Sequence, residues 1–293
     1  MKFEGSYVAL ITPFKNNGTE LDEDKLRELV NYHIENGTAG IVPCGTTGEA
    51  PTLTFAEHEK VIKIVVEEVK GRIQVVAGAG SNNTARAVEL TKYAKELGAD
   101  AALSTCPYYN KPSQEGLYQH FKAIAEVSPL PIVLYNVPGR TGINMKAETT
   151  VKLARDFSNI IAVKEASGSL EQVDEIIKNK PDHFDVISGD DALTFSMIAS
   201  GAAGVISVIG NALPREFSRM IRLEFKGEYE PARKIHHMFT ELYSLLFVDG
   251  NPAGCKALLN DMGMIENVLR LPLVPTTITT KQKMADILKE LRI

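Results

Sequence analysis

Eight short apolar runs recur along the first 210 residues of this 293-residue chain, about 20 to 33 residues apart. The expected strands are residues 7–11, 40–42, 73–77, 101–103, 132–135, 160–163, 184–187 and 204–208. Each interval leaves room for a crossover helix, which parallel strands require. Strict alternation over eight units favours an α/β fold, the closed TIM (β/α)8 barrel. An open doubly wound sheet is the alternative, because periodicity alone does not show closure.

Helix signals fill the intervals between these runs. Thr54 with Glu57, and Ser169 with Gln172, have the spacing of capping boxes, and Ser113 has the position of an N-cap. The expected helices are residues 22–35, 55–70, 85–97, 114–126, 170–178, 190–200 and 214–226.

The pattern changes after the eighth unit. Residues 230–247, 252–262 and 281–292 have helical patterns with no strand between them. Such a tail is too short to hold much of a core by itself. We therefore expect a catalytic barrel over residues 1–226. A C-terminal helical region over residues 227–293 would pack on the barrel or on a neighbouring subunit.

Composition narrows the class of protein. A hydrophobic content of 44% with 24% charged residues is typical of a soluble globular protein. The net charge of −5 without a basic cluster argues against nucleic acid and membrane partners. Three cysteines without metal-ligand spacing favour a reducing compartment. With no signal-peptide pattern and no membrane-length apolar run, the expected location is the cytoplasm.

Lys164 ends the apolar run 160–163, whose two faces are both expected to be buried. Burial disfavours a charged lysine, and the neutral amine is a nucleophile that forms Schiff bases with ketones. The alternative is a lysine that extends to solvent or pairs with Glu165.

Polar segments follow other strands too. They are Gly45-Thr-Thr-Gly-Glu49 after the second strand, Pro107-Tyr-Tyr-Asn110 after the fourth, residues 135–142 after the fifth and Ser188-Gly-Asp-Asp191 after the seventh. In a parallel barrel the carboxyl ends of all strands meet at one mouth, where active sites form. We expect these segments to share one site with the lysine.

Each candidate residue has a functional and a structural interpretation. Thr46 and Thr47 could hold a carboxylate or merely form a turn. Tyr135 could carry protons for a Schiff-base lysine or simply fill the core. Arg140 could bind a substrate carboxylate or cover surface.

Other polar residues are expected to be structural. Tyr108 and Tyr109 suit a rim or an interface. Asp190 and Asp191 are expected to cap the following helix rather than bind metal. None of the six histidines lies at the carboxyl end of a strand, so no metal site is expected.

Jointly, these motifs resemble the dihydrodipicolinate synthase family, within the pyruvate-dependent lyase superfamily that includes N-acetylneuraminate lyase. The likeness runs from Gly5 to the C-terminal helices and includes Val163-Lys-Glu-Ala166. It implies a lyase of lysine biosynthesis in which Lys164 forms a Schiff base with pyruvate, and the resulting enamine adds to L-aspartate 4-semialdehyde. No cofactor is needed, because the imine itself is the electron sink.

The resemblance also implies residue roles. Tyr135, Thr47 and Tyr109 match the family's proton relay, with Tyr109 reaching into the site of a neighbouring subunit. Thr46 and Thr47 match the cradle for the pyruvate carboxylate. Gly189 matches a position whose backbone lines the pocket, and so does Ile206.

Arg140 separates this activity from its relatives. It matches the residue that holds the semialdehyde's carboxylate, whereas related aldolases acting on N-acetylneuraminate or 2-keto-3-deoxygluconate generally lack an arginine here. Such an aldolase is the alternative activity. A barrel retained only for binding is the alternative class, and the presence of both Lys164 and Tyr135 argues against it.

The resemblance extends to regulation and assembly. Members inhibited by L-lysine bind it at a subunit interface, at positions that match Ala50, His58, Asn82 and Tyr108. Arg86 stands where strongly inhibited bacterial members have a glutamate, and its cation would repel the ligand's ammonium. We therefore expect weak or absent lysine feedback. The family is commonly a homotetramer, a dimer of tight dimers.

Overall fold

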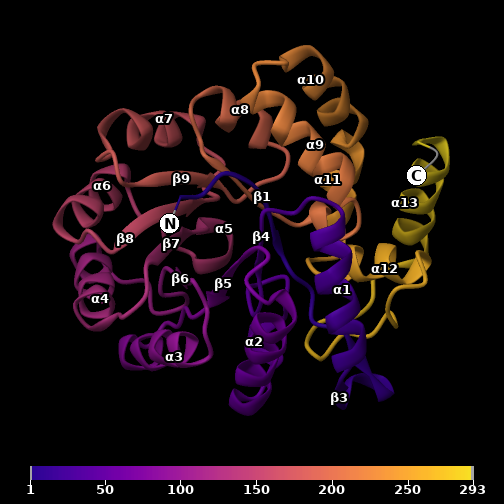
Figure 1. Ribbon diagram of the computed structural model, residues 1–293, viewed down its shortest axis with the longest axis horizontal. Coiled ribbons are helices and arrows are strands. Elements are labelled where there is room, and N and C mark those ends of the chain that lie inside the picture. The colour runs from indigo at the N-terminus through magenta and orange to yellow at the C-terminus, as the bar shows by residue number, and fades with distance from the viewer. Residues whose placement is uncertain (1, 292–293) are drawn as a thin grey trace.

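The computed structural model describes residues 2–291. Eight parallel strands form a closed barrel in the order β1-β10-β9-β8-β7-β6-β5-β4, and helices surround it (Figure 1). The barrel strands are β1 (Gly5–Ala9), β4 (Gly40–Val42), β5 (Gln74–Gly78), β6 (Ala101–Thr105), β7 (Ile132–Asn136), β8 (Ile160–Glu165), β9 (Asp185–Ser188) and β10 (Gly204–Ser207). Pairing of β4 with β1 closes the ring, so the TIM-barrel prediction is confirmed and the open sheet is excluded.

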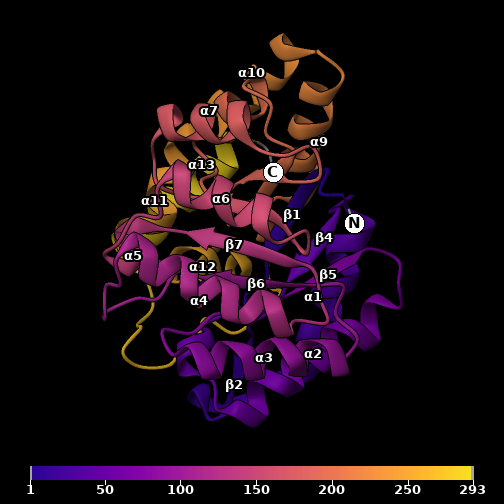
Figure 2. The same ribbon diagram turned by 90° about the vertical axis from the view of Figure 1, so that its left-hand side faces the viewer.

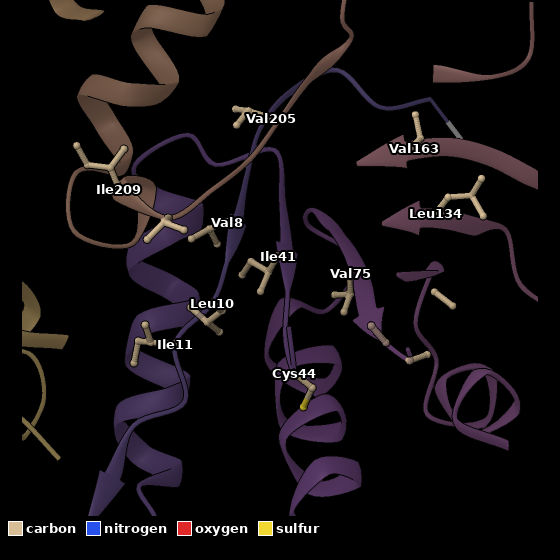
Figure 3. Packing of buried hydrophobic residues seen from close by; sticks show 14 of the residues in the cluster. Val8, Leu10, Ile11, Ile41, Cys44, Val75, Leu134, Val163, Val205 and Ile209 are labelled. Carbon is tan, nitrogen blue, oxygen red and sulfur yellow. The ribbon is translucent and has the colours of Figure 1, made fainter. Parts of the chain in front are cut away.

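Side chains alternate between the two faces of each strand, as the period of two requires. One face packs against the helices, where Val8, Ile41 and Val75 project from neighbouring strands (Figure 3). The other face fills the barrel interior with a second cluster that includes Val133 and Tyr135. This alternation determines which strand-end residues point into the barrel.

The barrel helices follow their sequence signals closely. They are α1 (Glu23–Glu35), α2 (Phe55–Val69), α3 (Thr84–Glu96), α4 (Gln114–Val127), α7 (Leu170–Asn179), α8 (Thr194–Ala199) and α9 (Pro214–Phe225). Thr54 and Glu57 form the complete capping box that was predicted. Ser169 caps α7, but the Gln172 side chain turns away to bond Glu165, so only half of the second predicted box forms.

Some elements were not predicted. A small hairpin of β2 (Phe14–Lys15) and β3 (Glu20–Leu21) precedes α1. Two helices, α5 (Pro138–Thr141) and α6 (Ala147–Asp156), lie between β7 and β8. The first follows Val137 directly, so the segment carrying Arg140 is a single helical turn rather than an irregular loop.

The C-terminal region contains α10 (Tyr229–Met238), α11 (Thr240–Val248), α12 (Ala253–Asp261) and α13 (Ile278–Leu291). The prediction of one helix over 230–247 is wrong. The fully buried Phe239 interrupts it at φ −100° and ψ 0°, and its N–H bonds His236 O in a tighter turn. Arg292, which the last predicted helix included, lies outside the described residues.

Three of the C-terminal helices lie towards the carboxyl ends of the barrel strands, whereas α10 packs on α8 and α9. Figure 2 shows α11, α12 and α13 on the same side as α5, which follows the carboxyl end of β7. Within residues 2–291, no helix has the length and apolar character needed to cross a membrane.

Candidate active site

A cavity of about 740 Å³ opens at the carboxyl ends of the barrel strands. It brings together residues from strands, loops and the C-terminal region that are far apart in the sequence. Six of the predicted site residues line it: Thr46, Thr47, Tyr135, Arg140, Lys164 and Gly189. The expected convergence of the strand-end segments on one site therefore agrees with the geometry.

Lys164 points into the barrel interior from β8. It pairs in register with Tyr135 on β7, and its Nζ lies 4.4 Å from the centroid of the tyrosine ring. The lysine is only 5% exposed. Among residues 2–291, neither a hydrogen bond nor an ion pair engages its amine, so the nitrogen is uncommitted beside a phenol.

Glu165 is not the partner of this lysine, contrary to the alternative considered above. Its side chain lies on the opposite face of β8, where it accepts hydrogen bonds from Asn136, Ser167 and Gln172. Burial raises the pKa of the Glu165 carboxyl, and these donors oppose that rise.

Gly189 provides the space in which the lysine side chain lies. A Cβ at this position would lie 3.1 Å from both Cγ and Cε of Lys164 and 2.8 Å from the Cβ of Ala166. Any other residue would therefore displace the lysine chain or the backbone.

The Gly45–Gly48 turn is held in a tight conformation. Cys44 and Glu49, on either side of it, both have left-handed backbones at φ 55° and 56°. Thr12 Oγ1 donates to Gly48 O at 2.6 Å. Within the turn, Thr47 is 2% exposed, so its hydroxyl is presented from a fixed position.

Three predicted site residues stand apart from the buried group. Arg140 is exposed at the cavity rim, on α5. Tyr109 is 90% exposed and does not line this chain's own cavity within the described residues. Ile206 is also absent from the described lining, because it packs in the barrel interior, in register with Tyr7 of β1.

The two aspartates after β9 do not cap α8, so that prediction is wrong. Asp190 Oδ1 accepts from Ala192 N, and α8 begins only at Thr194. Asp191 Oδ2 instead accepts from the N–H groups of Val208 and Ile209 after β10. Burial raises the pKa of Asp191 to about 6, although both N–H donors lower it.

The positions matched to lysine binding lie mostly in the same cavity. Ala50, His58, Arg86 and Tyr108 line it, whereas Asn82 is outside the described lining and donates to Tyr108 O. The Arg86 guanidinium lies 4.1 Å from the centroid of the Phe55 ring and pairs with Glu89. Burial, with Arg86 nearby, lowers the pKa of His58 to about 4.

Sequence reasoning missed contacts from the C-terminal region. Asn251 Nδ2 donates to Thr47 Oγ1 at 2.9 Å, and Lys256 Nζ lies 2.5 Å from Glu49 Oε1. A lone cation within the otherwise apolar run 252–259 was a usable signal that Lys256 is buried with a partner. Nothing in the sequence pointed to Glu49 as that partner.

Within residues 2–291, no group of three or more His, Cys, Asp or Glu side chains is placed to hold a metal ion. The amine of Lys164 is buried next to the Tyr135 ring, in one cavity with the hydroxyls of Thr46 and Thr47. Such an amine is suited to imine formation with a ketone.

Comparison with known proteins identifies the family. Residues 2–291 match the Dihydrodipicolinate synthetase family. This chain belongs to that family. It is 62% identical over 292 residues to the 4-hydroxy-tetrahydrodipicolinate synthase of Phocaeicola vulgatus, covering 100% of this chain and 98% of that protein. The relative from Parabacteroides distasonis, of the same name, is 60% identical over 293 residues, with 100% and 98% covered.

Solved structures of the family agree with this assignment. Dihydrodipicolinate synthase from Aquifex aeolicus is 47% identical with a TM-score of 0.96, covering 99% of this chain and 98% of that one. The enzyme from Cyanidioschyzon merolae, solved with lysine bound, is 43% identical with a TM-score of 0.94, covering 98% and 97%. The relatives' name supports the synthase over the sugar-acid aldolase that was its alternative.

Proposed function

We propose that this chain condenses pyruvate with L-aspartate 4-semialdehyde to give 4-hydroxy-tetrahydrodipicolinate and water. The observation that carries the proposal is the uncommitted amine of Lys164, 5% exposed, in one cavity with Tyr135, Thr46 and Thr47. Enamine chemistry needs this set, because the amine activates the ketone while nearby hydroxyls move protons.

The reaction begins when Lys164 Nζ adds to the ketone carbon of pyruvate. Loss of water gives an iminium, whose positive nitrogen allows a methyl proton to leave. The resulting enamine carbon attacks the aldehyde of the semialdehyde, and the aldehyde oxygen takes a proton to become a hydroxyl. The substrate's own amine then attacks the iminium carbon, closes the ring and releases the lysine.

Each site residue has a part in this proposal. Tyr135, Thr47 and Tyr109 relay protons, and Thr46 with Thr47 holds the pyruvate carboxylate. Gly189 contributes backbone to the pocket wall. Ile206, which the resemblance matched to the same part, packs in the barrel interior outside the described lining, so it is given no part here. Arg140, exposed at the rim, is placed to meet the carboxylate of an incoming second substrate with its planar fork.

We propose further that the active form is a homotetramer, a dimer of dimers. Tyr109, 90% exposed and absent from the described lining of its own cavity, is suited to reach a neighbour's site. Exposed apolar side chains such as Leu271, at 80%, and Ile278, at 88%, offer surface that a subunit could cover.

The cellular location and the domain division are part of the same proposal. A cytoplasmic location is supported by three buried cysteines that are all free. The division assigns catalysis to residues 1–226 and a separate helical region to 227–293, although Tyr243, Ser244 and Asn251 of that region also line the cavity.

The test compares second substrates. Purified protein is assayed with pyruvate plus aspartate semialdehyde, beside pyruvate plus N-acetylmannosamine or glyceraldehyde. We expect turnover with the semialdehyde only. Arg140→Ala should lose this reaction while still forming a borohydride-trapped pyruvate adduct, whereas Arg155→Ala, an exposed arginine on α6, should keep both. Turnover of a sugar aldehyde without turnover of the semialdehyde would contradict the proposal.

A further inference from the structure

The C-terminal region contributes a buried hydrogen bond to the substrate turn. Asn251 lies between α11 and α12, and its Nδ2 donates to Thr47 Oγ1 at 2.9 Å. Both side chains are almost inaccessible, at 5% and 2% exposed. A contact so well buried, between residues 204 positions apart, fixes the threonine hydroxyl relative to α12.

This bond constrains the direction of the hydroxyl proton. A threonine oxygen accepts through its lone pairs and donates through one O–H. With Asn251 Nδ2 as donor, the threonine oxygen is the acceptor, so its own proton must point elsewhere. Among residues 2–291 no acceptor bonds this O–H, which leaves the proton available to a ligand in the cavity that Thr47 lines.

We propose that Asn251 is a positioning residue that orients the Thr47 hydroxyl, so that its proton is directed at the bound substrate. The proposal rests on the proposed function and adds a residue from the C-terminal helical region to it. Catalysis by a positioned proton donor depends on such orientation, and small misplacements of it are costly.

A second buried contact holds the same two segments together. Lys256 Nζ on α12 lies 2.5 Å from Glu49 Oε1 at the end of the turn, and both side chains are 0% exposed. The amine also donates to Val268 O at 2.8 Å, and Glu49 Oε2 accepts from Arg270 N at 3.1 Å. Because Asn251 lies only two residues before the start of α12, this anchoring keeps its amide close to Thr47.

The test uses two variants that disturb the hydroxyl to different degrees. Asn251→Ala removes the donor and leaves the Thr47 O–H free to rotate. Asn251→Asp places an acceptor there, so the threonine must donate to it and its proton turns away from the cavity. Each is measured in the native background and with Thr47→Val. Asn179→Asp, an exposed amide on α7, is the matched control for the added charge.

We expect kcat to fall about tenfold in Asn251→Ala, where the hydroxyl is only freed, and about a hundredfold in Asn251→Asp, the lower end of general acid–base contributions. KM for pyruvate should change less than kcat. With Thr47→Val, neither Asn251 substitution should lower kcat further, because the effect acts through that hydroxyl. The deficit of Asn251→Asp should also shrink at low pH, since a protonated carboxyl donates as the amide did.

Several results would overturn the proposal. It is wrong if the Asn251 variants lower kcat equally with and without the Thr47 hydroxyl, or do not lower it at all. If thermal unfolding shows that Asn251→Asp does not fold, the proposal is tested by the kcat values of Asn251→Ala with and without Thr47→Val. A native protein that neither traps pyruvate nor makes product would refute the proposed function itself. If the native protein traps pyruvate and makes product, but the effect of the Asn251 substitutions does not depend on the Thr47 hydroxyl, only the role of Asn251 is refuted.

Discussion

Replacement of Lys256 by methionine tests how strongly the C-terminal region is tied to the substrate turn. The side chains of Lys256 and Glu49 are completely buried and 2.5 Å apart. Burial lowers the pKa of Lys256 to about 8, and Glu49 opposes that fall, so the amine remains largely charged at neutral pH. Lys256→Met keeps most of the volume but leaves a buried carboxylate without its counter-ion.

The expected cost follows from this geometry. Removing one member of a buried pair costs about 3–5 kcal/mol. Losing the hydrogen bond to Val268 O adds about 1 kcal/mol. We therefore expect Lys256→Met to lower the free energy of unfolding by about 4–6 kcal/mol. At roughly 2 °C per kcal/mol for a chain of this size, Tm should fall by about 10 °C.

The assay is urea and thermal unfolding of a double-mutant cycle. Glu49→Gln alone should cost about 3–5 kcal/mol, whereas Lys256→Met with Glu49→Gln should cost only about 2 kcal/mol, because no uncompensated charge remains. The control is Lys234→Met, which breaks an exposed pair with Glu230 on α10 and should cost under about 0.5 kcal/mol.

Two results would refute this reasoning. One is a Lys256→Met variant that is no less stable than Lys234→Met. The other is a double variant as unstable as the sum of its two single substitutions, which would mean that the charges do not compensate each other in the folded protein.

Three further predictions concern the cavity and its surroundings. Gly189→Ala should slow imine formation with pyruvate about a hundredfold while the fold persists, because the new Cβ pushes on Lys164. Lysine up to millimolar concentrations should leave turnover nearly unchanged, and Arg86→Glu should introduce inhibition, because a carboxylate replaces the repelling cation. Hydrogen bonds from Arg270 lower the pKa of Glu57 to about 2 from its usual 4.5. Because solvent screens this partly exposed pair, the stabilisation by Glu57 should be about 1 kcal/mol. It should be complete above pH 4.5 and be lost as the pH falls towards 2.

Each of these has its own control. Gly139→Ala, with open space around the new Cβ, should trap pyruvate as the native protein does. Half-inhibition of the native enzyme by submillimolar lysine would refute the argument from Arg86. For Glu57, stability is compared with Glu57→Gln across pH, and a difference that persists unchanged at pH 2 would exclude the ion pair with Arg270 as its source.

The barrel was predictable because the sequence signals for its strands and helices are local. Each strand is a short apolar run, and several helices begin at caps such as Thr54 and Ser113, whose hydrogen bonds form as expected. Predictions failed where tertiary contacts override such signals. Phe239 buries its ring and thereby interrupts a continuous helical pattern. Asp191 does not cap the helix that follows it; its carboxylate accepts a hydrogen bond from the backbone after β10.

The candidate site was also predictable only in part. The strand-end rule places Lys164, Tyr135 and the threonines in one cavity, because parallel strands share one carboxyl end. The strand-end rule does not predict that Asn251 and Lys256 belong to the site. Their partners lie about 200 residues away in the sequence, and no local pattern indicates a pairing at that separation. Tyr109 is exposed and absent from the described lining of its own cavity, so its proposed role in the proton relay requires a second copy of the chain.

The proposed catalysis depends on one amine that forms a covalent bond with pyruvate. Mass spectrometry of the protein after incubation with pyruvate and borohydride, followed by peptide mapping, detects this bond directly. We expect a single reduced pyruvate adduct located on Lys164, absent from Lys164→Ala and present in Lys146→Ala. No adduct, or an adduct located on another lysine, would contradict it.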